Sequence, residues 1–179
     1  MLSKTSESLL QNTWHICFKK SISCHLSRFT PHFCWLCGQD KQPEDYNAIT
    51  LSRTIRLLFI GDIVGKPGRE LTRRAIPPLI DRYSLDLVIA NVENAAGGFG
   101  ITRKIGESIR ESGVDVMTSG NHIWDKKEVI DYIPTQPRLI RPANYPEGVP
   151  GHGHYEATTA LGDMVTVINI MGQVFMANL

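Results

Sequence analysis

Short hydrophobic runs alternate with amphipathic segments through the middle of the chain. The runs are almost continuously apolar, as is typical of strands buried on both faces of a sheet, and they occupy residues 55–60, 86–92 and 114–118. After each run, apolar residues at helical spacing predict a helix: one with Pro67 in its first turn, one over 102–112, and one that ends at Pro134. Leu139 and Ile140 begin a fourth apolar run. The pattern predicts alternating strands and helices from residue 55 onward.

Local signals refine the limits of these helices. Pro77 and Pro78 lack a backbone N–H group and should kink or split the first helix. Gly113 suits the C-terminal cap of the second helix. Asp125 and Glu128 have the spacing of a capping box, which predicts that the third helix starts there.

The connections between strands change in kind along the chain. Strands that alternate with helices imply right-handed crossovers and a parallel sheet, whose strands all end at the same edge. Open α/β sheets bind their ligands along that edge. Further on, strand-like segments at 155–160 and 164–170 are separated only by Leu161-Gly162-Asp163, which predicts a hairpin.

Oxygen-bearing side chains follow three consecutive predicted strands. Asp62 follows the first strand, Glu93 and Asn94 follow the second, and Asn121 and His122 follow the third. These groups lie about 30 residues apart, the length of one crossover unit, so the spacing predicts that they meet at one edge. Each alone has another explanation: Asp62 could cap a helix or bind a ribose hydroxyl, the residues after the second strand and Asn121 could be turn residues, and His122 could be a surface histidine. Three such groups in succession favour a shared metal site.

The ligand types indicate the metal and its chemistry. Carboxylate and amide oxygens suit Mn²⁺, Mg²⁺ or Fe, and nearby imidazoles favour Fe, Mn or Zn. Glu93 could bridge two divalent ions that polarise a water for attack on phosphorus, and His122 could protonate the departing oxygen. The pattern predicts a phosphoester hydrolase with two divalent metal ions, with Fe or Mn preferred to Mg or Zn.

Two glycine-rich segments offer other interpretations. The glycines at 61, 65 and 68 could cradle a nucleotide phosphate, but they lack the Lys-Ser/Thr of a P-loop and the G-x-G-x-x-G spacing. Gly151-His152-Gly153-His154 imitates the Gly-His-x-His ligand pair of dimetal phosphoesterases. Because it precedes the hairpin instead of following a strand, we expect His152 and His154 to lie in a solvated loop.

Composition separates the first 53 residues from the rest. All four cysteines lie in the first 37 residues, and residues 1–53 show no sustained helical or strand period. Cys34 and Cys37, with Cys24, His25 and His32 nearby, permit a zinc or redox interpretation, but a second well-spaced ligand pair is missing. We expect a low-order extension over 1–53 and a partial domain over 54–179.

Charge and hydropathy narrow the functional class. The chain has 179 residues, 42% of them hydrophobic, and a net charge of +1, so its bulk charge does not indicate nucleic-acid binding. No apolar run approaches the ~20 residues of a membrane helix. We expect a cytoplasmic protein.

Four segments resemble the bacterial YmdB-like metallophosphoesterases. They are LFIGDIVGKPGR (58–69), NVENAAGGFG (91–100), GNHIWDKKE (120–128) and RPANYPEG (141–148). The resemblance implies a four-layer α/β/β/α sandwich with a di-iron or dimanganese centre that hydrolyses phosphodiesters, including 2',3'-cyclic nucleotides. Asp62-Ile63-Val64 departs from the Asp-x-His of ordinary calcineurin-like phosphoesterases and resembles the branch in which a glutamate bridges the ions.

The resemblance also implies roles for single residues. Asp62 would bind one metal, Glu93 would bridge both, Asn94 and Asn121 would complete the part of the site present here, and His122 would be the proton donor. The remaining ligands of the family are histidines in a Gly-x-His-x-His run that follows the hairpin. The resemblance therefore implies a C-terminally truncated domain that holds half of the site.

Two functional expectations follow from this half-site. The longer parent protein would hydrolyse small phosphodiesters or cyclic nucleotides, while the 179-residue chain alone would be inactive or poorly folded. Alternatively, the chain is a remnant that holds a cyclic nucleotide or an RNA end without cleaving it.

Overall fold

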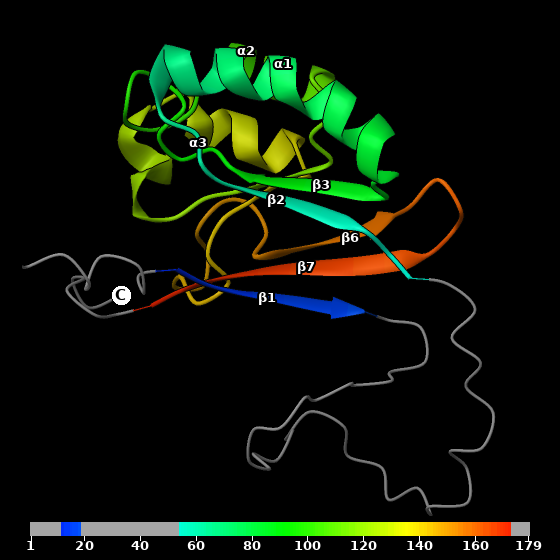
Figure 1. Ribbon diagram of the computed structural model, residues 1–179. Coiled ribbons are helices and arrows are strands. Elements are labelled where there is room, and N and C mark those ends of the chain that lie inside the picture. The colour runs from blue at the N-terminus through cyan, green and yellow to red at the C-terminus, as the bar shows by residue number, and fades with distance from the viewer. Residues whose placement is uncertain (1–11, 19–53, 173–179) are drawn as a thin grey trace, which may run out of the picture.

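A parallel sheet lies between a layer of helices and a second, antiparallel sheet (Figure 1). The computed structural model describes residues 12–18 and 54–172. The parallel sheet has the order β2-β3-β4-β5, with strands Leu57–Asp62, Leu87–Asn91, Val116–Thr118 and Leu139–Ile140. The antiparallel sheet has the order β1-β7-β6, with strands Asn12–Phe18, Met164–Met171 and His154–Thr158. The predicted α/β class, with parallel crossover units and a final hairpin, is confirmed.

The helices connect successive strands of the parallel sheet. They are α1 (Gly65–Tyr83), α2 (Arg103–Glu111) and α3 (Val129–Tyr132), with 3₁₀ turns η2 (Asn121–Asp125) and η3 (Ile133–Thr135). No helix in the described part of the chain is long and apolar enough to cross a membrane. Three of the four expected layers are present among the described residues, in the order α/β/β.

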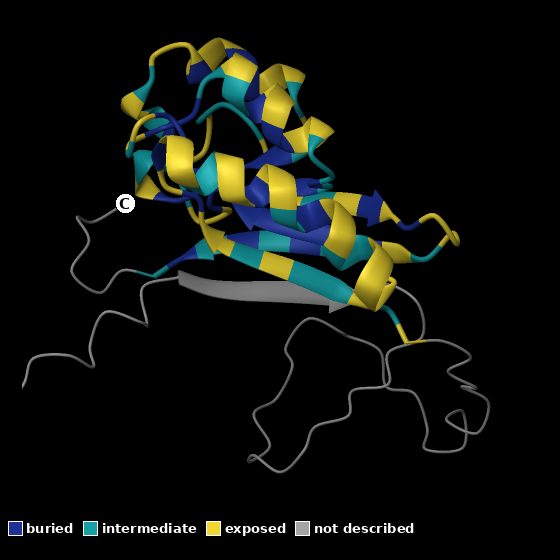
Figure 2. Cartoon of the chain, turned by 45° about the horizontal axis from the view of Figure 1, so that its top comes forward, coloured by how far each residue is buried: buried dark blue, intermediate teal, exposed yellow. Residues whose placement is uncertain are grey.

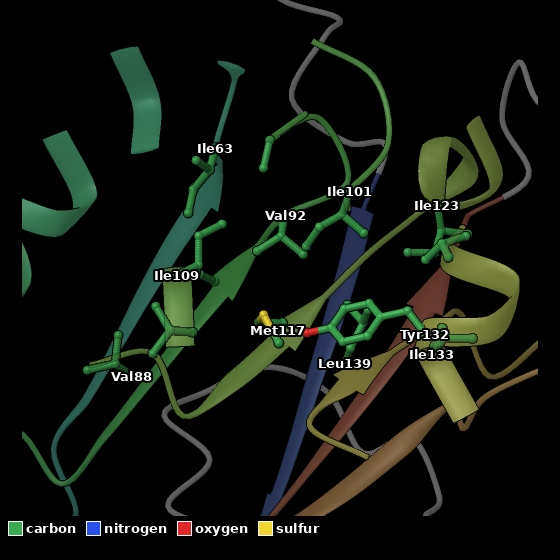
Figure 3. Packing of buried hydrophobic residues seen from close by; sticks show 14 of the residues in the cluster. Ile63, Val88, Val92, Ile101, Ile109, Met117, Ile123, Tyr132, Ile133 and Leu139 are labelled. Carbon is green, nitrogen blue, oxygen red and sulfur yellow. The ribbon is translucent and has the colours of Figure 1, made fainter. Parts of the chain in front are cut away.

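Alternation along the central strands divides the core into two parts. Val88 and Ala90 of β3 pack toward the helices, whereas Leu87 and Ile89 pack toward the second sheet. Because successive side chains of a strand point to opposite faces, one apolar run contributes to the core on the helix side and to the core between the two sheets. Figure 2 shows the result as buried central strands beneath helices with exposed outer faces. On the helix side, the ring of Tyr132 faces Met117 (Figure 3).

Of the two predicted effects of Pro77 and Pro78, a kink or a split, the split does not occur. Helix α1 continues from Gly65 to Tyr83 with both prolines inside it. The two prolines are exposed, as are Arg73 and Arg74, whose carbonyls lose their helical donors. Water can satisfy those carbonyls on the outer face, so the helix does not need to end.

The predicted capping box at Asp125 and Glu128 is also wrong. Glu128 is the N-cap residue of α3 but makes no side-chain capping bond. Its Oε1 atom accepts the backbone N–H of Arg103 at 2.7 Å, and Asp125 pairs with His122 instead. The side chains of Asp125 and Glu128 therefore bind His122 and Arg103 and do not cap the start of the helix. Gly113, in contrast, follows the C-cap of α2 with φ +105°, as expected.

One strand lies in the segment that was expected to show little packed structure. β1 pairs antiparallel with β7 along its whole length, from Asn12 opposite Met171 to Phe18 opposite Val165. The rest of 1–53, including the cysteine and histidine cluster, lies outside the described residues. The division at residue 53 and the zinc interpretation therefore stay predictions.

Candidate active site

The ends of β2, β3 and β4 place the predicted residues at one edge of the parallel sheet. Asp62 pairs with Asn91 across a register shift between Ile60 and Asp62. The Nδ2 atom of Asn94 donates to Asp62 Oδ2 at 2.8 Å, which joins the first two strand ends. The expected convergence of Asp62 with the loop after β3 is thus present in the structure.

Glu93 is the buried acid of this edge. Only 5% of Glu93 is exposed, and its Oε2 atom accepts the backbone N–H of His122 at 3.0 Å. The backbone N–H of Glu93 donates to Asn91 Oδ1 at 3.2 Å, which fixes the turn after β3. Among the described residues, no basic side chain forms an ion pair with Glu93. A buried carboxylate without a basic partner suits a bound cation.

Gly120 makes room for that carboxylate. A Cβ atom at position 120 would lie 2.6 and 2.7 Å from the two carboxylate oxygens of Glu93. The glycine of the Gly-Asn-His sequence is therefore required by a close approach between two loops. This contact brings the third strand end to the same place as the second.

The side-chain oxygen of Asn94 offers a further ligand. Oδ1 is buried and has no hydrogen-bond partner within the described part of the chain, while Nδ2 is used by Asp62. A buried acceptor without a donor is costly, and a cation would satisfy it. The donor set of Asp62, Glu93 and Asn94 thus fits a hard divalent ion.

The described residues supply few ionisable ligands to such an ion. In the ranges that the structure describes, no group of three or more His, Cys, Asp or Glu residues lies close enough to hold a metal. Asn121 begins η2 and is exposed at the same edge. The geometry offers two carboxylates and two amides at this edge.

His122 is oriented by Asp125, which the sequence pattern had placed in a capping box. Its Nδ1 atom lies 2.7 Å from Asp125 Oδ2. An acceptor at Nδ1 keeps the proton there and leaves Nε2 to exchange a proton with a ligand. The ring of Phe99, which is 57% exposed on the glycine-rich loop, meets the imidazole edge-on at 5.2 Å between centroids.

The side chain of Tyr145 supports the loop after β4. No pattern in the sequence predicted an individual role for this residue. Its hydroxyl group donates to the carbonyl oxygen of Gly120 at 3.1 Å. Burial raises the pKa of Tyr145 to about 12, and the nearby charge of Glu93 adds to this effect. The phenol therefore stays protonated and able to donate. The only sequence signal for it was its place in the Arg-Pro-Ala-Asn-Tyr segment.

The structure argues against the nucleotide-loop interpretation. The backbone N–H of Gly65 donates to the Asn94 carbonyl at 3.0 Å, and that of Gly68 donates to Val64 at 3.1 Å. Phosphate cradles need such N–H groups to point at the ligand. These two groups are already used within the fold.

The histidines before the hairpin are exposed, as expected, but only His152 lies in a loop, since His154 belongs to strand β6. His152 forms an isolated parallel bridge with Ile140, and His154 begins β6. Between them, a Cβ atom at Gly153 would collide with the backbone of Ala143, so this segment is packed tightly against the chain after β5. Its glycines are explained by packing rather than by metal ligation.

Comparisons with known proteins give one consistent family. The model of the YmdB-like protein family matches residues 58–179. The chain is 48% identical over 122 residues to a 2',3'-cyclic-nucleotide 2'-phosphodiesterase of Bacillus subtilis (strain 168), which covers 68% of this chain and 46% of that protein.

Two solved structures share the fold. A hypothetical protein from Thermus thermophilus gives a TM-score of 0.63 at 42% identity, over 70% of this chain and 48% of that one. A novel phosphatase from Mycoplasma pneumoniae gives a TM-score of 0.55 at 33% identity, over 59% and 39%. The chain spans less than half the length of each of these three proteins.

Proposed function

Because the chain belongs to the YmdB-like protein family, we propose that it supplies the proton donor and half of the ligands of a metal-dependent phosphodiesterase. The substrate class is small phosphodiesters such as 2',3'-cyclic nucleotides, which the name of the Bacillus relative specifies. The observation that carries the proposal is buried Glu93, without a basic partner in the described chain, beside the buried and unbonded Oδ1 of Asn94.

Four residues would hold the metal. Asp62, Glu93, Asn94 and Asn121 end successive strands at one edge, and we assign two divalent ions, Fe or Mn before Mg or Zn, to the complete site. When bound, such ions lower the pKa of water and stabilise charge on a phosphoryl group. The carboxylate of Glu93 is held for this role by the backbone N–H of His122 and the space at Gly120.

His122 is assigned as the general acid. Asp125 holds Nδ1, so the Nε2 atom of a protonated ring is the donor that can deliver a proton to the departing oxygen. The rings of Phe99 and His122 are in contact, which limits the orientations of the imidazole. Asp125 acts through His122 and is a positioning residue.

The second candidate is a protein that binds such a nucleotide without cleaving it. It is favoured by the small number of ionisable ligands in the described chain, where no cluster of three acidic, histidine or cysteine residues occurs. Amide oxygens and two carboxylates would hold Fe or Mn weakly.

Phosphorus NMR separates the two candidates. The 179-residue chain is incubated with 2',3'-cyclic AMP, once in Mn²⁺-free buffer and once with Mn²⁺. The signal of the cyclic phosphate is followed over time in both samples. Conversion to a monoester that disappears in His122→Ala supports the phosphodiesterase. Binding by calorimetry without conversion, both by this chain and by a longer form that carries the remaining ligands, supports the binding protein.

A metal-binding control tests the ligand set independently of turnover. Electron paramagnetic resonance distinguishes free from bound Mn²⁺, and Glu93→Gln should release it because the variant loses the buried negative charge. Glu128→Gln changes an exposed acid outside the edge and should bind Mn²⁺ as the unchanged chain does. Equal binding by both variants would refute the assignment of Glu93.

A further inference from the structure

Helices α1 and α2 lie in the layer that covers one face of the parallel sheet (Figure 1). Side chains of α1 and of residues 108–112 line one cleft. Its lining consists of three cations, one acid, two serines and one buried isoleucine: Lys66, Arg69, Glu70, Arg73, Ser108, Ser112 and Ile109. Lys66 pairs with Glu70 at 3.7 Å, whereas neither arginine of the lining forms an ion pair with a carboxylate in the described part of the chain. The cleft therefore presents an excess of positive charge and the hydroxyl group of Ser108. The hydroxyl group of Ser112 already donates to the Ile109 carbonyl oxygen at 2.6 Å.

Positive charge is concentrated on these two helices. α1 carries five basic and two acidic side chains and α2 carries three and two, although the whole chain has a net charge of only +1. Arginine and serine side chains are typical donors to phosphate oxygens. The local charge and the donor types fit a polyphosphate backbone better than a neutral ligand.

The cleft is joined directly to the catalytic edge. Arg69 Nη1 donates to the carbonyl oxygen of Ala95, the residue after Asn94, and the backbone N–H of Gly65 donates to the Asn94 carbonyl. From the rise of an α-helix, Arg69 and Arg73 lie roughly 6 and 12 Å along the axis from Gly65. Phosphates of an extended single strand that left the edge would pass at this distance.

We propose that the α1–α2 cleft binds the backbone phosphates of an oligoribonucleotide whose terminal 2',3'-cyclic phosphate occupies the catalytic edge. This inference rests on the proposed function. The terminal group has a chemical origin in RNA, because attack of a ribose 2'-hydroxyl on the adjacent phosphodiester breaks the strand and leaves a 2',3'-cyclic phosphate. The remaining phosphates of that strand then need a cationic path away from the edge.

Fluorescence anisotropy tests the cleft without any turnover. A 5'-labelled oligoribonucleotide that ends in a 2',3'-cyclic phosphate is titrated with the 179-residue chain in the absence of added metal. Arg73→Ala should weaken binding about fivefold and reduce the salt slope by about one, as loss of one phosphate contact does. Glu70→Gln removes the acid of the lining and should tighten binding.

Arg74→Ala is the matched control. Arg74 is adjacent on α1, exposed and equally charged, but it is not part of the cleft lining. Its variant should bind within about twofold of the unchanged chain. Equal weakening by Arg73→Ala and Arg74→Ala would show a general charge effect and overturn the proposal.

Two further outcomes would also overturn the proposal. One is that the mononucleotide 2',3'-cyclic AMP competes as well as the oligoribonucleotide does, and the other is that polyglutamate displaces the strand equally well. The proposed function is tested separately, by measuring whether the mononucleotide is cleaved in the presence of Mn²⁺. Selective binding of the strand without that cleavage would retain the cleft and show that the 179-residue chain is not a hydrolase by itself.

Discussion

The carboxylate of Glu93 is positioned by a residue without a side chain. Gly120 has φ −141° and ψ −138°, and a methyl group there would meet both carboxylate oxygens closer than 3 Å. Because Glu93 is buried, it cannot move away without losing the N–H of His122.

Gly120→Ala should therefore weaken Mn²⁺ binding at least tenfold, because it displaces the ligand. The variant is compared with Gly61→Ala, where a Cβ atom meets nothing within 4 Å. The measurement is the fraction of bound Mn²⁺ by electron paramagnetic resonance, with circular dichroism to confirm folding. Unchanged affinity in Gly120→Ala would show that Glu93 does not hold the metal.

Asp125 matters to the imidazole rather than to the helix that follows it. Asp125→Asn replaces the carboxylate that faces His122 Nδ1 at 2.7 Å with a group that supports the imidazolium less well. We expect kcat to fall about 10- to 100-fold for diesters with an alkoxide leaving group, which need a proton, and much less for p-nitrophenyl esters. Asp131→Asn, an exposed acid of α3, is the control. An equal loss for both leaving groups would contradict the positioning role.

At the scale of elements, the loop between β4 and α3 depends on the chain after β5. Tyr145 donates to the carbonyl oxygen of Gly120, and Trp124 stacks at a tilt with the Tyr145 ring, 6.3 Å between centroids. The loop that connects β4 to β5 is thus held by the segment that connects β5 to β6. The parallel order β3-β4-β5 makes these loops neighbours.

This support should be lost in alkali. The pKa of Tyr145 is raised to about 12 in the folded chain, above the ~10 of a free tyrosine, because burial and the charge of Glu93 disfavour the phenolate. Its stabilising contribution is complete below about pH 10 and disappears as the pH rises to about 12.

Thermal melting of the wild-type chain and Tyr145→Phe measures this effect. The wild-type chain should melt higher at neutral pH, since the variant lacks the bond to Gly120. The difference in Tm should shrink between about pH 10 and 12. A difference that stays constant over this range would exclude ionisation of Tyr145 as the cause.

At the scale of the whole molecule, Asn169 joins the two sheets. It lies on β7, is 1% exposed, and its Nδ2 atom donates to the carbonyl oxygens of Ser119 and Ile140. Its backbone N–H donates to Gly153, and its carbonyl oxygen accepts from Ala143. The antiparallel sheet therefore reaches the backbone immediately before Gly120.

Asn169→Ala should lower the free energy of unfolding by about 2–4 kcal/mol, because it removes the donor to the Ser119 carbonyl and opens a cavity. The Ile140 carbonyl keeps the Ser119 hydroxyl as a donor. Urea unfolding measures the loss. Thr166→Ala, a half-buried position on the same strand, should cost less than about 1 kcal/mol and serves as the control. Equal losses in the two variants would show that the side-chain bonds of Asn169 are unimportant.

The amino-acid sequence by itself determined most strands and helices after residue 54 and the edge at which polar residues converge. It did not predict β1 or the continuity of α1. Apolar runs and helical spacing depend on local periodicity, and a parallel sheet aligns the ends of its strands, so the pattern alone could place Asp62, Glu93 and His122 together. The pattern could not predict the hydrogen-bond partner of an individual side chain. Asp125 and Glu128 have capping-box spacing, but competing contacts with His122 and Arg103 decide where their side chains go.

Only the tertiary structure decided which residues support the site. Tyr145 and Asn169 act across the boundary between connections and between sheets, at 25 and 50 residues from their partners, and no local pattern encodes such contacts. The continuity of α1 through two prolines likewise depends on which face of the helix meets solvent. Local periodicity fixes the elements of this protein, and long-range packing fixes the atoms that hold Glu93 and His122 in place.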